Sequence, residues 1–423
     1  MQDLIKKSLK KRYRKELIFK LCGKASIAFA MIFLVVFFAL IIEKGYKAFI
    51  SHEISLQIDL SKESIIANSD LTANYNELTT DEIIDQIDYP QLIKQSLRQK
   101  FSEIKDEEKQ NKLYYMLSAI ADFSLKEKLM KNRDLIGAKA NLWLGVSSKV
   151  DVYYKYKIAP SFNEEEISLL DNLLKSGEIK TVFNSQFLQS ADSREPEAAG
   201  IAASLVGSLL TIAIFLIFAF PIGVMCAFYL EEFAKKNRLT DIIEISINNL
   251  AAIPSIIYGL LGLTIYLQFF HLPRSSALVG GMTLFMLVLP VIIIATRNTI
   301  RAIPQSIRDA AMSLGASKMQ VTLHHLLPLS IPGIMTGTIL AMSRALGETA
   351  PLLMIGMVAF IADIPQSFSE PATVLPVQIY LWSDSPEIGF AEKTAAAILV
   401  LLLFLIAFNL VAIILRKRFE RKW

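Results

Sequence analysis

Cysteine and histidine are scarce in this chain, which has two cysteines and four histidines among its 423 residues. Two cysteines cannot build the disulfide framework of a small secreted domain, and the cysteines and histidines do not have the spacing of a metal site. The scarcity therefore excludes disulfide-stapled scaffolds and provides no candidate metal ligand.

Several short motifs that carry chemistry are also missing. No G-x-x-x-x-G-K-[ST] occurs, so the chain itself is not expected to bind ATP for work. The H-E-x-x-H motif and the G-x-S-x-G nucleophile elbow are missing too. We therefore predict no catalytic residue, no cofactor and no metal, and the chain is not predicted to be an enzyme.

Apolar residues, by contrast, are abundant. The chain is 53% hydrophobic with a mean hydropathy of +0.42, yet 20% of its residues are charged and these are segregated. This combination indicates an integral membrane protein with one substantial soluble part. Basic residues near membrane ends report orientation rather than nucleic-acid binding, so no nucleic-acid partner is expected.

Six apolar runs are long enough to cross a lipid bilayer, which requires about 20 apolar residues. The predicted spans are Ala25–Ile42, Ala198–Leu230, Ile245–Phe270, Ser275–Thr296, Ile331–Ile361 and Thr394–Leu415. The first run lacks the small-residue cleavage site of a signal peptide, so we expect it to remain as an anchor. Pro221 is expected to kink the second span and Pro254 the third.

The charges that flank the spans predict their orientation. Residues 1–24 carry nine Lys or Arg against two acids, and residues 417–423 are also basic, which places both termini in the cytoplasm. The loop 297–329 is basic and expected inside, whereas the loop 363–393 has five acids and one lysine and is expected outside. The chain is thus predicted to comprise a basic tail (1–24), a first transmembrane helix (25–45), an extracytoplasmic domain (46–195), a transmembrane domain (196–416) and a second basic tail (417–423).

The predicted extracytoplasmic domain has no spanning run and about the length of one domain. Apolar spacing predicts helices at Asp81–Phe101 and Asn163–Leu174, and alternation at 150–156 predicts a strand. We expect a mixed α/β domain, and no residue in it indicates its role.

A polar helix–turn–helix interrupts the apolar runs between Arg308 and Ile334. Gly315 is expected to end its first helix, Ser317 to cap its second, and Pro328 to mark the return to the membrane. Small residues in the first helix would let the surface of another protein approach closely. An ordinary cytoplasmic loop is the alternative that composition leaves open.

The residues of this segment resemble the EAA loop of ABC importer permeases. Asp309-Ala-Ala is followed by Gly315 and, beyond a nine-residue spacer and two further residues, by Leu327-Pro328. Asp309 stands for the usual glutamate of that family, and His325 for the usual isoleucine. The resemblance implies that the loop enters a groove of an ATP-binding subunit dimer, where ATPase activity resides. The implied coupling residues are Asp309, Ala310, Ala311, Gly315, Leu327 and Pro328.

A charged pair lies within the fifth predicted span. Arg344 and Glu348 are four residues apart, so their side chains are expected on one helix face. Charge inside a bilayer normally faces a cavity or a partner. The guanidinium offers forked donors that suit phosphate oxygens, and Glu348 would temper its charge. A structural ion pair is the alternative. Gly333 and Gly337 on the same span form a GxxxG pattern that suits close helix contact.

The string Arg344-Ala-Leu-Gly-Glu-Thr-Ala-Pro-Leu-Leu resembles the signature of phosphate-specific ABC importer permeases of the PstA type. The string at 252–262, A-I-P-S-I-I-Y-G-L-L-G, is similar to a second motif of that family. The resemblance covers Ala198–Leu415, and the N-terminal span with its outside domain looks like an extended PstA form. It implies an all-α membrane protein, a six-span type I ABC importer permease with an inserted mixed α/β extracytoplasmic domain. It also implies a substrate pathway at Arg344, Glu348 and Thr349.

The same resemblance implies a multi-pass subunit of the cytoplasmic (inner) membrane that passes phosphate. Its implied partners are an ATP-binding subunit dimer, a PstC-type second permease subunit in a heterodimer, an extracytoplasmic phosphate-binding protein and the lipid bilayer. A PstC-type sibling, or a permease for molybdate, tungstate or sulfate, is the alternative within the class. A membrane ligand sensor is disfavoured because the six spans leave no cytoplasmic output domain, and a secondary transporter because no inverted repeat is found.

Overall fold

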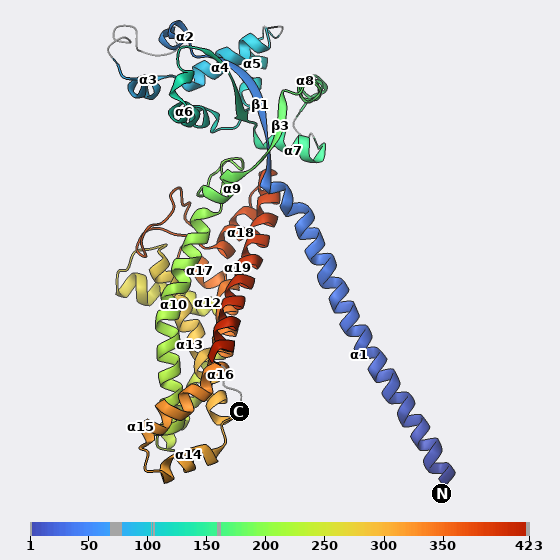
Figure 1. The fold of residues 1–423 in the computed structure, drawn as a ribbon, viewed down its shortest axis with the longest axis vertical. Coiled ribbons are helices and arrows are strands. Elements are labelled where there is room, and N and C mark those ends of the chain that lie inside the picture. Colours follow the sequence, from blue (N-terminus) through green and yellow to red (C-terminus); the bar gives the residue numbers. More distant parts are fainter. Residues whose placement is uncertain (1, 68–77, 103, 105, 159–161, 420–423) are drawn as a thin grey trace.

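The computed structural model describes residues 2–67, 78–102, 104, 106–158 and 162–419. Figure 1 shows a long N-terminal helix, a small domain built on a sheet, and a bundle of long helices. The bundle ends, on the side away from the small domain, in the short helices α14 and α15.

The N-terminal helix α1 (Gln2–Gly45) is continuous and diverges from the bundle (Figure 1). It contacts the bundle at its outer end, where Gly45 lies against Ala395 and Leu399 of α19 (Gly389–Phe419). Its apolar side chains are exposed, as the 72% exposure of Phe29 illustrates. Such a helix is stable only in lipid or against another protein, which agrees with a membrane span.

The small domain is organised around β1 (Ile50–Asp59), which pairs antiparallel with an edge strand on each side, β2 (Lys139–Gly145) and β3 (Ile179–Phe183). Alternate residues of β1, including Leu56 and Ile58, are fully buried, as a strand with one covered face requires. The surrounding helices are α2 (Lys62–Ala67), α3 (Thr80–Gln86), α4 (Tyr89–Lys100), α5 (Glu107–Tyr114), α6 (Ala121–Lys131), α7 (Ser148–Tyr156) and α8 (Glu164–Lys175). The predicted mixed α/β domain is confirmed.

The predicted strand at 150–156 is wrong, because this segment forms helix α7. Val150 and Tyr153 are buried three residues apart, which is helical spacing. Asp151 and Lys155 pair four residues apart, with 2.5 Å between Oδ2 and Nζ. The apparent alternation of apolar residues therefore hid a helical periodicity.

The helix predicted at Asp81–Phe101 is divided into α3 and α4. Pro90 lies in the first turn of α4, where its missing N–H costs nothing. The side chain of Asp88 caps α4 by accepting the N–H of Gln91 at 3.0 Å. The helix predicted at Asn163–Leu174 is confirmed as α8.

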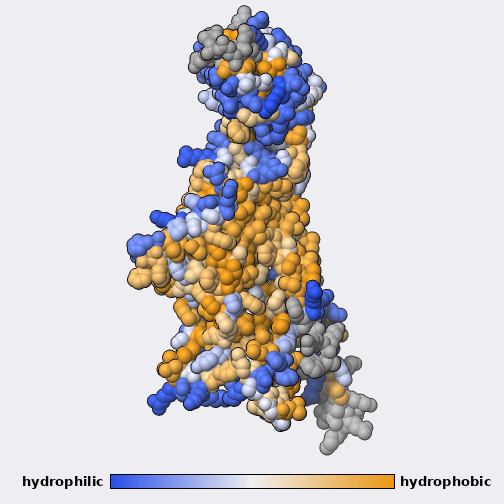
Figure 2. All heavy atoms as spheres, turned by 60° about the vertical axis from the view of Figure 1, so that its left-hand side comes forward, coloured by the Kyte–Doolittle hydropathy of each residue, from blue (hydrophilic) through white to orange (hydrophobic). Residues whose placement is uncertain are grey.

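The bundle is built from four long helices that pack in series. Helix α10 (Ala202–Phe228) packs on α13 (Ala277–Arg301), α13 packs on α16 (Leu327–Gly347), and α16 packs on α19. Figure 2 shows a continuous apolar surface along the bundle between two polar ends. Such a surface fits the hydrocarbon core of a bilayer.

Among the described residues, five helices are long and apolar enough to cross a membrane. A bent pair of helices makes a sixth span if it is taken as one: α11 (Arg238–Ala252) and α12 (Ser255–Gly262), which continues as a π-helical stretch (Leu263–Phe269). The two halves meet at 102°, and Pro254 stands at the bend, as expected for the third span.

The fifth predicted span, Ile331–Ile361, is wrong as a single helix. Helix α16 ends at Gly347, and a short helix α17 (Ala350–Met354) follows. Pro351 lies in the first turn of α17 and cannot donate an N–H to a continuing helix. The chain then runs through an outer loop to α18 (Leu375–Ser383) and α19.

Gly333 and Gly337 bring α16 very close to α13, as the GxxxG pattern predicts. A Cβ atom at Gly333 would overlap the side chain of Thr299, and one at Gly337 would overlap Cβ of Ala295. The two contacts share one antiparallel register. Arg344 lies further along the same helix, within the candidate membrane span Lys318–Gly347.

We expect Gly337→Leu to force α16 away from α13 and to lower the stability of the protein by about 1–3 kcal/mol, because the backbone has no room for a side chain. Thermal unfolding in detergent would measure the loss. Gly23→Leu is the matched control, since a Cβ atom at Gly23 meets no atom within 4 Å. Equal melting temperatures for the two variants would contradict the close packing.

Candidate coupling loop and membrane pathway

The polar segment between α13 and α16 folds as a helix–turn–helix. Helix α14 (Gln305–Ser313) is followed by Gly315, whose φ of +85° lies in the left-handed region that favours glycine. Ser317 caps α15 (Lys318–Val321) in a reciprocal capping box with Gln320, at 2.8 and 3.3 Å. A π-helical turn then leads into α16. The expected roles of Gly315 and Ser317 in ending and capping the two helices are confirmed.

One face of α14 packs on the bundle and the other is open. Ala311 is buried, whereas Ala310 and Asp309 are exposed, and Asp309 accepts a hydrogen bond from Gln305 at 3.2 Å. Leu327 and Pro328 are half-buried at the start of α16. The loop therefore offers a surface of small residues and one carboxylate.

The tip of the loop also exposes apolar side chains that the sequence analysis missed. Leu314, directly before Gly315, is 90% exposed, and Met312 and Met319 are 43% and 56% exposed. Apolar groups concentrated on an otherwise polar loop mark a surface for another protein. Their position beside the turn glycine was the available signal.

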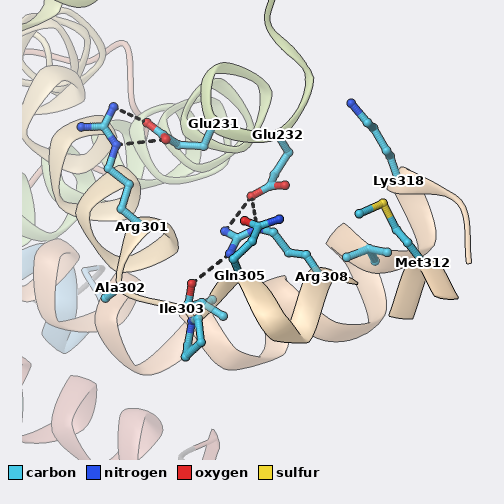
Figure 3. Close-up of a pocket in the computed structure, with 11 residues that line it drawn as sticks. Glu231, Glu232, Arg301, Ala302, Ile303, Gln305, Arg308, Met312 and Lys318 are labelled. Carbon is cyan, nitrogen blue, oxygen red and sulfur yellow. Dashed lines mark hydrogen bonds and ion pairs between the residues drawn. The ribbon is translucent and has the colours of Figure 1, made fainter. Parts of the chain in front are cut away.

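A buried ion pair attaches α14 to the end of α10. Nη2 of Arg308 lies 2.9 Å from Oε1 of Glu232, and both side chains are at most 15% exposed. The same guanidinium donates to the carbonyl oxygens of Ile303 and Ile300 at 2.9 and 3.1 Å. Figure 3 shows Glu232 directed at Arg308 from the turn Tyr229–Phe233. Arg308 thus joins α14 to the turn after α10 and to the end of α13.

Neighbouring ion pairs join three spans. Arg297, near the end of α13 that leads into the loop, lies 2.6 Å from Glu231 and 2.5 Å from Glu244 of α11. Arg301 contacts Glu231 at 2.8 Å, as Figure 3 also shows. The sequence analysis used these arginines for orientation and missed their partners, which are far away in the sequence. Together with Arg308–Glu232, they form a network that links α10, α11, α13 and α14.

Beside this network lies a cavity of about 610 Å³ between α14, α15 and the turn after α10. Glu231, Glu232, Arg301, Arg308 and Lys318 supply its charged lining (Figure 3). The lining carries both signs of charge, and most of these groups are paired with one another. Among the described residues, the cavity therefore does not have the cluster of unpaired polar groups of a ligand site.

The charged pair of the membrane segment stands at the break between α16 and α17. Nε of Arg344 lies 3.6 Å from Oε1 of Glu348, and the side chains are 43% and 21% exposed. The expectation that both residues belong to one helix is wrong, because Glu348 is the first residue beyond α16 and has extended backbone angles. Thr349 begins the next turn, and its carbonyl oxygen accepts the N–H groups of Leu352 and Leu353.

The fold brings together the two strings that resemble family motifs. A Cβ atom at Gly259 of α12 would lie 2.7 Å from Cα of Pro351, and one at Gly262 would lie 2.5 Å from Oγ1 of Thr283. Ser343, beside Arg344, donates to Asn409 of α19 at 3.1 Å. The segments on the two sides of the break at Glu348 therefore contact α12 and α19.

The predicted site residues fall into two groups. Asp309, Ala310, Ala311 and Gly315 lie on the loop, whereas Arg344, Glu348 and Thr349 lie about halfway along the bundle. Helix α16 connects them, because it begins at Leu327 beside the loop and ends at the break. A continuous helix therefore joins the loop to the charged pair.

Comparison with known families gives two matches. The family described as binding-protein-dependent transport system inner membrane component matches residues 219–423. A domain of unknown function, DUF3333, matches residues 6–164. The first match covers most of α1 and the sheet domain as far as the start of α8, and the second begins within α10.

Curated proteins similar to this chain include permeases. The phosphate transport system permease protein PstA of Haemophilus influenzae is 30% identical over 214 residues, which cover 51% of this chain and 74% of that protein. That of Yersinia pestis is 31% identical over 213 residues, with coverages of 50% and 71%. The probable ABC transporter permease protein YqgI of Bacillus subtilis is 31% identical over 241 residues, with coverages of 54% and 81%. Among solved structures, the inward-facing MetNI methionine ABC transporter has 17% identity and a TM-score of 0.42, covering 51% of this chain and 95% of that one.

We expect Glu232→Lys to release α14, because it places two positive charges together at the Arg308 position. Hydrogen exchange at the amides of α14 should become faster in the variant. The double variant Glu232→Lys with Arg308→Glu, which swaps the two charges, should restore slow hydrogen exchange. The same charge swap at the pair Glu16–Lys20 serves as the control, since both side chains of that pair are more than half exposed. Unchanged exchange in Glu232→Lys would show that other contacts orient the loop.

Proposed function

The chain belongs to the PstA-type family of ABC importer permeases, the binding-protein-dependent transport system inner membrane components, and from this premise we propose that it carries inorganic phosphate across the membrane. Permease subunits of this family use ATP hydrolysed by a separate subunit. The chain would thus supply the pathway and the coupling loop.

The observation that carries the proposal is the charged helix break at Arg344. In the part of the chain that the structure describes, Glu348 is the acceptor that its guanidinium meets, and the 3.6 Å contact through Nε is too long for a hydrogen bond. Both terminal amino groups of Arg344 are then available for the oxygens of a phosphate. Glu348 lowers the net charge beside the anion, which favours release as well as binding.

Helix breaks of this kind suit a translocation pathway. Non-helical backbone at membrane depth is tolerated where it is buried in protein or lines a water-filled cavity. In this chain two broken segments, α11–α12 and α16–α17, contact each other beside Arg344. We propose that Arg344, Glu348 and Thr349 form the phosphate pathway there.

A second permease subunit would complete this pathway. Leu340, Arg344 and Gly347 lie on one face of α16 that the rest of the chain leaves exposed. A charged side chain that faces lipid costs about 2.5–3.5 kcal/mol even on insertion scales. A protein surface is therefore expected to cover this face, and we propose a PstC-type subunit in a heterodimer.

The loop would receive the movement of an ATP-binding subunit dimer. Its exposed Leu314, Met312 and Met319 suit a groove on such a subunit, and Gly315 sets the angle between α14 and α15. We propose Asp309, Ala310, Ala311, Gly315, Leu327 and Pro328 as the coupling residues. The ion network would then carry the displacement to α10, α11 and α13 together.

The topology follows from this arrangement. With the loop in the cytoplasm, both termini are cytoplasmic, and domain 46–195 stands outside the inner membrane, where a phosphate-binding protein delivers the substrate. Uptake of labelled phosphate into vesicles that hold the chain, its ATP-binding subunits and its permease partner tests the proposal. Uptake of labelled molybdate, tungstate or sulfate by the same vesicles, without uptake of labelled phosphate, would assign another oxyanion.

We expect Arg344→Ala to reduce phosphate uptake about 10–100-fold while the complex still assembles, since hydrogen bonds to charged groups contribute roughly 1.5–3 kcal/mol each. Arg344→Lys should retain part of the activity, because lysine keeps the positive charge but lacks the paired N–H donors of the guanidinium. Arg238→Ala, at an exposed site on α11, is the control. Wild-type uptake in Arg344→Ala would remove this residue from the pathway.

We expect Gly315→Ala to uncouple ATP hydrolysis from uptake as strongly as Gly315→Leu does. A Cβ atom at Gly315 meets no atom of this chain within 4 Å, whereas φ of +85° strains any residue with a Cβ by about 1–2 kcal/mol. Gly315→Asn should be milder, since asparagine tolerates this conformation. The ratio of phosphate transported to ATP hydrolysed measures coupling, and a graded effect of size would point to a steric role instead.

A further inference from the structure

The sheet domain is joined to the bundle by a second buried ion network, which the permease function does not explain. Nζ of Lys155 in α7 lies 2.5 Å from Asp151 and 2.7 Å from Oε1 of Glu392 in α19. The Lys155 and Glu392 side chains are 4% and 7% exposed. Asp151 also accepts from the ring and the backbone N–H of His52, at 2.9 and 3.1 Å. The network thus joins β1, α7 and α19.

The turn after α1 (Tyr46–Phe49) enters the same junction. Nζ of Lys47 donates to the carbonyl oxygen of Lys155 at 3.2 Å and lies 3.7 Å from the centre of the Tyr156 ring. The hydroxyl of Tyr156 contacts Glu392 at 3.4 Å. Figure 1 shows α1, α19 and the sheet domain converging at this point.

Backbone contacts reinforce the ion pairs. The carboxylate of Glu197 accepts the N–H groups of Ala119 and Ser148, both at 3.2 Å, so the segment before α10 caps α7. Gly389, the first residue of α19, has no room for a Cβ because Ser148 and Pro196 press against it. Lys393 is buried and donates to the carbonyl oxygen of Ala199 at 2.5 Å. Glu197 thus joins the domain to the segment before α10, Lys393 joins that segment to α19, and Gly389 packs α19 directly on α7.

Helix α19 continues from this junction to the pathway. Asn409 accepts a hydrogen bond from Ser343, the neighbour of Arg344, and Arg416 donates to Thr336 of α16 at 3.2 Å. The same helix therefore holds the outside domain at one end and α16 at the other.

We propose that domain 46–195 and α19 form one rigid body, clamped by Lys155 and Glu392, through which a substrate-delivering protein that docks on the domain acts on α16. The identity of that partner rests on the proposed function; the rigid attachment does not. Lys155 and Glu392 are positioning residues in this scheme, because they touch neither substrate nor nucleotide.

A distance measurement tests the rigid attachment in the assembled transporter. Cys22 and Cys226, the two native cysteines, are replaced by serine, and spin labels are attached to Lys131→Cys in the domain and Leu403→Cys on α19, both exposed. We expect a narrow distance distribution that is the same without nucleotide and with a trapped ATP analogue. A shift between the two states would overturn the proposal.

The double variant Lys155→Met with Glu392→Gln should broaden this distribution, because it removes the Lys155–Glu392 ion pair at unchanged net charge, while Asp151 keeps the contacts with His52. Lys109→Met with Glu165→Gln, at an exposed pair with a 2.6 Å contact, is the matched control and should leave the distribution narrow. A narrow distribution in the Lys155–Glu392 variant would overturn the clamp.

ATP hydrolysis tests the transmission. Phosphate-loaded binding protein outside should stimulate ATP hydrolysis about tenfold less in the Lys155→Met, Glu392→Gln variant than in the wild type. The rate of hydrolysis without binding protein should be unchanged. Full stimulation in a variant with a broadened distribution would overturn the transmission. A wild-type complex that phosphate-loaded binding protein does not stimulate would contradict the proposed function, whereas the distance measurement would still decide the clamp.

Discussion

The structure depends on the cost of placing a charge within a membrane span. Arg344 lies in a candidate span, and Glu348 offsets its charge only in part, because Nε of Arg344 and Oε1 of Glu348 are 3.6 Å apart. The backbone beside them is not helical, which is tolerated at this depth only against protein or water. The charged pair therefore requires surroundings that a lipid-facing helix cannot provide, and the helices around it are arranged to provide them.

Glycines make these surroundings possible. Gly333 and Gly337 let α16 approach α13, and Gly259 and Gly262 let α12 approach α17 and α13. Without a hydrophobic force between helices in lipid, such close backbone contact is a main source of attraction. The two broken segments thus stabilise each other at the depth where each alone would expose polar backbone groups.

The parts of the molecule with local structure were predictable from sequence. Gly315 and Ser317 act through their own backbone neighbours, so spacing alone gave the turn and the cap. The break at Glu348 was not predicted, because its spacing from Arg344 is also helical and Pro351 was the only contrary signal. The pair Lys155–Glu392 joins residues 237 positions apart, and no local pattern reveals such a contact. The strand predicted at 150–156 was wrong because the apolar residues of this segment fit both the period of a strand and that of a helix.

The geometry of the three ion clusters separates structural charge from functional charge. Arg297–Glu231 and Lys155–Glu392 have contacts of 2.6 and 2.7 Å, and their side chains are at most 14% exposed. Charges held in this way are satisfied within the chain and serve to fix one element on another. Arg344–Glu348 is longer and more exposed, although its place in the membrane makes an unsatisfied charge most costly there. The chain forms tight buried ion pairs at both ends of its bundle, but the pair between them is loose. The guanidinium of Arg344 is therefore available for another acceptor.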